Sequence, residues 1–310
     1  THAALDREVP LGPYVTQDPL EHEHEAYTLE CRYVLAQLAA HPKEALADRA
    51  YDKELPALAE VVGNYDQFLQ RIDTSYRGGN SVAGEDVKTV GQLVQDETGR
   101  TLARRAAYAA RRLEGLVRTA SAELLGLKET QSALDAFQKD YDRRDSDFRA
   151  RTLPLMQAQT KAQAPAWAAQ ALADAAAAPT GEDRFFSISA ANTLARMARA
   201  QGSDDGGVLD KARDLAVGTA RADLARAGRT RDAEGAYGAL WEAESFADLS
   251  SDAAVKADAD RAVRRYVEQT LAGGGGDARL FYSSELAKRI GDSALQARVE
   301  AARAAPGGAP

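Results

Sequence analysis

The feature that most constrains the fold is an apolar stripe at helical spacing that runs from Glu85 to Leu155, with no proline before Pro154. Its first part advances three or four residues at each step, an average of about 3.6, the period of an ordinary α-helix. One helix of this span would extend roughly 100 Å, far beyond the diameter of a compact domain. We therefore expect one very long helix that other helices cover. The stripe begins with Val87, Val90, Val94, Thr98, Leu102, Ala106, Ala109, Leu113, Leu116, Ala120, Leu124 and Leu127.

The stripe keeps its phase across Gly126, which predicts a kink there rather than a reversal of the chain. After Leu127 its spacing tightens to about 3.5 residues, the period of helices that wind around one another. The opposite face is dense in charge, as expected of a solvated surface. The tighter part is the better candidate for contact with another chain. Its aromatic side chains lie on the apolar stripe, where core packing is their commoner role and partner contact the alternative; they are Phe137, Tyr141 and Phe148.

The composition favours an all-α protein, because alanine and arginine are abundant and only 6% of the 310 residues are aromatic. The best domain boundary is the Ala-rich run that ends in Pro179-Thr180-Gly181. We expect an elongated helical bundle upstream of it and a stack of helical hairpins downstream. The predicted parts are an extended arm at residues 1–17, the bundle at 18–178, the hairpin domain at 182–305 and a flexible tail at 306–310.

Capping signals locate the first helix of the bundle. Asp18 suits the N-cap, Pro19 the first helical position, and Glu21 completes a capping box, so the helix runs from there to just before His41. A second helix is expected over about 52–76 and an Ala-rich one over 166–178. Downstream, helices are expected at about 183–201, 208–227, 231–247, 252–272, 277–290 and 292–305.

These last helices alternate with short loops rich in Gly and Asp, which is typical of an irregular α-solenoid. Their starting points follow no fixed period, and the tetratricopeptide pattern is not matched. No family is recognised from the sequence.

The sharpest local motif is the run from Glu21 to Glu25, which holds three carboxylates and two histidines in five residues. Helical spacing places Glu21, His24 and Glu25 on one side, where they could bind a divalent metal such as Zn²⁺. A complete di-metal site is excluded, because neither His2 nor His41 follows a glutamate by three residues. An acid-rich first helical turn accounts for the same residues without a cofactor.

No nucleophile motif, phosphate loop or calcium loop is present, so no catalytic residues are predicted. Cys31 lies in line with the apolar face of its helix, which indicates a buried structural thiol. In the C-terminal half, four aromatic side chains could serve either packing between helices or protein recognition. These candidate partner-binding residues are Tyr237, Trp241, Phe281 and Tyr282.

The net charge of −8 argues against nucleic-acid binding, and no apolar run is long enough to span a membrane. The start at Thr1 and the polar middle favour an exported protein over a cytoplasmic one. The preferred hypothesis is a non-enzymatic scaffold or adaptor that binds other proteins or associates with itself. The alternatives are a helical protein that binds a metal or small ligand through residues 21–25, and an all-α enzyme with a site assembled from scattered residues.

Overall fold

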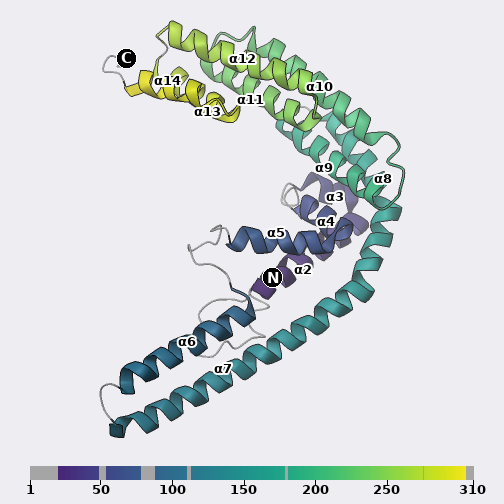
Figure 1. The fold of residues 1–310 in the computed structure, drawn as a ribbon. Helices are drawn as coiled ribbons and strands as arrows, with labels where there is room; N and C mark the ends of the chain where they lie inside the picture. Colours follow the sequence, from purple (N-terminus) through teal and green to yellow (C-terminus); the bar gives the residue numbers. More distant parts are fainter. Residues whose placement is uncertain are drawn as a thin grey trace. The chain divides into compact units, whose positions relative to one another are not determined.

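The computed structural model describes residues 20–48, 54–77, 88–109, 113–178, 181–274 and 276–304, with side chains left undescribed over 105–123. The prediction of an all-α protein is confirmed, since no strand occurs in these ranges (Figure 1). No described helix is both long and apolar enough to cross a membrane. The helices are α2 Leu20–Ala40, α3 Pro42–Ala47, α4 Glu54–Gly63, α5 Tyr65–Arg77, α6 Val90–Ala109, α7 Leu113–Asp147, the π-helix η2 Phe148–Thr152, α8 Leu153–Ala177, α9 Gly181–Ala200, α10 Val208–Ala227, α11 Ala233–Ser250, α12 Ala253–Ala272, α13 Asp277–Arg289 and α14 Ser293–Ala304.

The chain divides into two compact units, one of residues 1–45 and 50–163, the other of residues 46–49 and 164–310. The division falls within α8, upstream of the Pro179 to Gly181 segment that the sequence favours as the boundary. The later part of α8 contributes Leu172 and Ala175 to a core with Ile188 and Phe246. This part of α8 therefore belongs to the second unit.

The prediction of one very long helix over 85–155 is wrong. The stripe is divided between α6 and α7, which lie side by side (Figure 1). Val90 and Leu93, at the start of α6, pack against Leu134 and Phe137, late in α7. At this end of the pair each helix thus buries apolar side chains of the other, whereas Leu102, farther along the stripe, is 58% exposed. Residues 110–112, between them, lie outside the described residues.

Helix α7 passes through Gly126 and is followed without interruption by η2 and α8. In η2 the backbone N–H of Leu153 donates to the carbonyl of Phe148, five residues earlier. This wide turn directly precedes Pro154, whose ring would clash with the carbonyl four residues before it in a regular α-helix. The predicted Ala-rich helix is the second half of α8, which also continues through Pro165.

The single helix predicted over 52–76 is instead two helices, α4 and α5, divided at Asn64. The side-chain oxygen of Asn64 accepts a hydrogen bond from the backbone N–H of Gln67 at 3.2 Å, while its carbonyl accepts from Phe68. These are the contacts of an N-cap, so Asn64 begins a new helix directly after Gly63. Both helices pack against α2.

The second unit contains all the helices predicted between 183 and 305. Each of α9 to α14 packs against the next helix, and most also pack against the next but one (Figure 1). Small side chains allow the close approach, since Ala212, Ala216 and Ala220 of α10 are fully buried in one core. Asp232 and Asp252 cap α11 and α12 by accepting hydrogen bonds from backbone N–H groups of the first turn.

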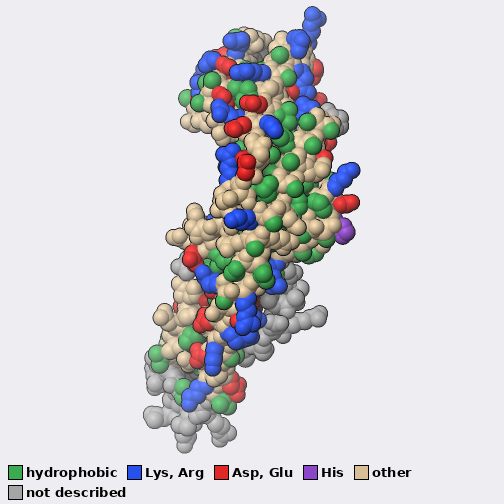
Figure 2. All heavy atoms as spheres, turned by 90° about the vertical axis from the view of Figure 1, so that its right-hand side faces the viewer, with side chains coloured by type: hydrophobic (Ala, Val, Ile, Leu, Met, Phe, Trp, Pro, Cys, Tyr) green, Lys and Arg blue, Asp and Glu red, His purple; other side chains and the backbone are tan. Residues whose placement is uncertain are grey.

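On the face of the molecule in Figure 2, basic and acidic side chains are interspersed among hydrophobic ones. They do not gather there into a patch of one sign.

Candidate functional site

In the first unit, the three predicted metal-binding side chains of α2 form contacts with three different helices, α5, α6 and α7. The carboxylate of Glu21 accepts a hydrogen bond from the backbone N–H of Val90 at 3.3 Å, and burial raises the Glu21 pKa. Glu25 pairs with Arg144, with Oε1 and Nε 2.8 Å apart. In the described part of the chain, no group of three or more His, Cys, Asp or Glu side chains is arranged to hold a metal ion. The metal hypothesis therefore gains no support from this geometry.

His24 forms a relay with a tyrosine and an aspartate. Its Nδ1 lies 2.9 Å from Oη of Tyr141, and its Nε2 lies 2.6 Å from Oδ1 of Asp73. Burial raises the pKa of Tyr141 well above its ordinary value, so the phenol stays protonated and shares a hydrogen bond with the imidazole of His24. The relay ties α2, α5 and α7 together, and it does not supply a phenolate nucleophile.

Beside this relay lies a hollow of about 410 Å³, lined by α2, α5, α7 and η2. Tyr65, Tyr141 and Phe148 form its aromatic wall, with the rings of Tyr65 and Phe148 centred 4.9 Å apart. Its volume is typical of ligand pockets. Two of the predicted partner-binding residues, Tyr141 and Phe148, thus line a hollow, whereas Phe137 is only 5% exposed and packs against His22.

A second hollow of about 500 Å³ adjoins the first, since Arg32 and Thr152 line both. We call the two together the α2–α8 groove. One wall belongs to α2 and the other to the run from α7 through η2 into α8. The groove is lined by Glu25, Thr28, Leu29, Arg32, Leu35, Ala36, Ala39, Ala40, Tyr65, Tyr141, Arg144, Asp145, Asp147, Phe148, Arg151, Thr152, Leu155, Met156 and Gln159.

The rim of the α2–α8 groove exposes apolar side chains on both walls. Leu155 is 71% exposed and Leu29 is 37% exposed. Below them, Leu35 and Met156 are buried. The amino-acid pattern carries no direct sign of this groove, because it arises where two helices far apart in the chain approach each other. Helical spacing along α2 would have identified one wall only.

Arginine side chains form ion pairs with carboxylates inside the groove. Besides the Glu25 pair with Arg144, Asp145 accepts a hydrogen bond from the Tyr65 hydroxyl at 3.0 Å and pairs with Arg149 at 2.7 Å. The guanidinium of Arg149 also lies over the Tyr65 ring, 4.6 Å from its centre. The carboxylates of Glu25 and Asp145 are thus each held by an arginine.

In the second unit, the predicted partner-binding aromatics pack on one another. The rings of Tyr237 and Tyr282 stack with centres 4.6 Å apart, and the guanidinium of Arg289 lies 4.3 Å from the centre of Trp241. These side chains also border the hydrophobic core of α11, α13 and α14. Phe281 is the most exposed of the four, at 45%. Whether they bind a partner stays a prediction.

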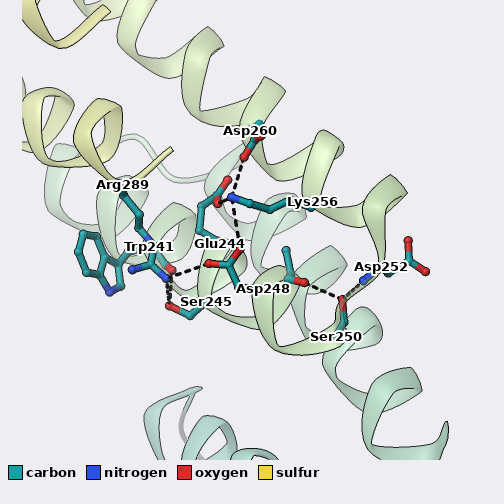
Figure 3. A network of polar contacts seen from close by, with 10 residues as sticks. Trp241, Glu244, Ser245, Asp248, Ser250, Asp252, Lys256, Asp260 and Arg289 are labelled. Atoms are coloured by element: carbon teal, nitrogen blue, oxygen red, sulfur yellow. Dashed lines mark hydrogen bonds and ion pairs between the residues drawn. The ribbon is translucent and has the colours of Figure 1, made fainter. Parts of the chain in front are cut away.

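A polar network beside Trp241 joins α11, α12 and α13 (Figure 3). Lys256 pairs with the fully buried Glu244 and with Asp260, the latter at 2.8 Å. Burial raises the pKa of Glu244. For Lys256, burial alone would lower the pKa, but the hydrogen bonds to Asp260 and Glu244 outweigh it and raise the pKa. A lysine held in this way stays charged, so it serves packing rather than nucleophilic chemistry.

Comparison of the chain with protein-family models, with curated proteins and with solved structures gives no match.

Proposed function

We propose that this protein is a non-enzymatic helical scaffold or adaptor that binds a helix of another protein in the α2–α8 groove. One observation carries the proposal: two adjoining hollows form a continuous groove with exposed leucines on both walls. Exposed apolar surface that is contiguous and grooved is typical of interaction sites. An amphipathic helix laid into an apolar groove is a common way for one protein to recognise another.

The length of the groove supports a helical occupant. Its lining residues on α2 run from Glu25 to Ala40, about four turns and roughly 24 Å of helix. On both walls they recur at three- and four-residue steps, so ridges and grooves of side chains are available to an incoming helix. Ala36, Ala39 and Ala40 have small side chains, which leave room for the backbone of that helix.

We further propose that the first unit is an elongated bundle and the second an irregular α-solenoid-like stack. The second assignment is supported by the packing of neighbouring helices from α9 to α14. The aromatic cluster of Tyr237, Trp241, Phe281 and Tyr282 remains a candidate for a second contact with a partner. Under this proposal the two units form separate surfaces of one adaptor.

Photo-crosslinking tests the groove directly. A photo-reactive amino acid, p-benzoylphenylalanine, replaces Leu155, Leu29 or Leu125 in the full chain within its own cells. Leu125 is the matched control, because it is 60% exposed on α7 and does not line the groove. We expect Leu155 and Leu29 to give the same discrete adduct and Leu125 to give none. Mass spectrometry of the adduct should map the crosslink to a helical segment.

Two outcomes contradict the proposal. One is the absence of any protein adduct from both groove positions. The other is an identical set of adducts from all three positions, which would mean non-specific contact. An adduct of twice the mass of this chain would identify a second copy as the occupant, which keeps the groove as a docking site and makes the protein self-associating.

A further inference from the structure

We propose that the α2–α8 groove selects an acidic amphipathic helix, meaning one whose apolar face is flanked by Asp or Glu. This inference rests on the proposed function, because it names the chemistry of the helix that the groove would take. The inference is based on two observations: some charged side chains of the groove are already paired, and others remain accessible to a partner.

The carboxylates of the groove are largely buried and paired. The side chains of Glu25 and Asp145 are 14% and 19% exposed, and both are held by arginines. Asp147 is the exception, because it is 49% exposed and its ion pairs with Arg143 and Arg151 are long, at 3.7 and 3.8 Å. Glu25 and Asp145 therefore present little negative charge to an incoming helix.

The cations on the rim are accessible. The side chain of Arg151 is 81% exposed, and its ion pair with Asp147 is at the long limit for such a contact. Arg32 is exposed as well, and none of the described carboxylates lies within ion-pair distance of it. Arg32 lines both hollows and Arg151 lines the first, so a bound helix would pass between two guanidinium groups.

The apolar and the positively charged side chains of the groove together define the occupant. Leu29, Leu155 and Met156 offer contacts to an apolar stripe, and the arginines offer bidentate bonds to carboxylates on either side of it. Because rim charges act mainly through orientation and rate of encounter, they select among helices more than they add affinity. A basic helix would place its cations against Arg32 and Arg151 and be rejected.

A display library tests the inference. It presents helices of about four turns with a fixed apolar stripe and with Glu, Gln or Lys varied at the flanking positions. We expect the full chain to enrich Glu-flanked helices and to bind a selected one at least about tenfold more tightly than its Lys-flanked counterpart. This preference should weaken as the salt concentration rises.

Matched variants locate the effect. Arg151→Glu should remove the preference for Glu-flanked helices, whereas Arg104→Glu, the same charge change at an exposed site on α6, should leave it intact. Leu155→Glu should abolish binding, and Leu125→Glu should not. Circular dichroism of each variant checks that the fold is retained.

The outcomes separate the two proposals. If helices that depend on Leu155 are selected but carry neutral or basic flanks, the acidic helix is overturned and the groove remains a docking site. If no selected helix depends on Leu155, the acidic helix is again overturned, and the photo-crosslinking result then decides the proposed function by itself.

Discussion

At the scale of single residues, Asp223 of α10 carries a predictable pH dependence. It is 8% exposed, and burial raises its pKa to about 6, although Arg226 lies 2.9 Å away. Because this pKa is above the ordinary 3.8 of an unfolded chain, the folded state binds the proton more tightly. The stabilisation is therefore complete below about pH 4 and is lost as the pH rises through about 6.

We expect the free energy of unfolding of the second unit to fall by about 1–3 kcal/mol between pH 4 and pH 7 on account of Asp223. Asp223→Asn should remove this part of the pH dependence. Urea titrations followed by tryptophan fluorescence measure it, because Trp167 and Trp241 both lie in the second unit. The control is Asp214→Asn on the exposed face of the same helix. Equal pH slopes in Asp223→Asn and the unaltered protein would refute this role for Asp223.

At the scale of elements, the α6–α7 hairpin can be distinguished from one long helix by a distance. Cys31 is 1% exposed, and burial raises its pKa to about 12, so spin labels can be directed to introduced cysteines. Leu102→Cys and Leu125→Cys suit labelling, since both leucines are more than half exposed. A single helix would separate these positions by about 35 Å.

In the hairpin, pulsed electron spin resonance should give a distance below about 25 Å, because packed helices lie only 8–10 Å apart. A distribution centred near the long-helix value would contradict the hairpin. A second pair, at Leu125 and the exposed Leu155, reports on a continuous helical run in either arrangement and serves as the control.

At the scale of the whole molecule, periodicity predicted the helical class and the positions of α9 to α14 because each has its own capping or glycine signal. Periodicity did not locate the end of a helix that has no capping or glycine signal. The stripe keeps its phase through Ala110-Arg111-Arg112, which contain no glycine or proline, so nothing local indicated the end of α6. Conversely, Asn64 is an N-cap signal for the start of α5, but the apolar pattern continues on both sides of it and hides the boundary.

The candidate site was predictable only in part, for the same physical reason. Tyr141 and Phe148 were singled out as aromatics on the stripe and do line the groove. The sequence pattern does not identify Arg32, Arg144 and Tyr65 as site residues, because their importance comes from contacts between helices that are distant in sequence. Helical spacing shows which side chains share a face, and the tertiary structure alone shows which faces meet.

The π turn of η2 holds one residue that an α-helix would not need. A turn closed by five-residue hydrogen bonds contains one residue more than an α-turn, so a deletion there can be absorbed by reversion to α-helix once Pro154, which the wide turn accommodates, is replaced by alanine. In a Pro154→Ala background, deletion of the exposed Ala150, in η2, should keep Phe137 and Leu155 in phase with their surroundings. In the same background, deletion of the exposed Ala162, inside α8, should rotate the remainder of that helix by about 100°. Thermal melting should therefore show a much smaller loss for the first deletion, and equal losses would mean that η2 holds no spare residue.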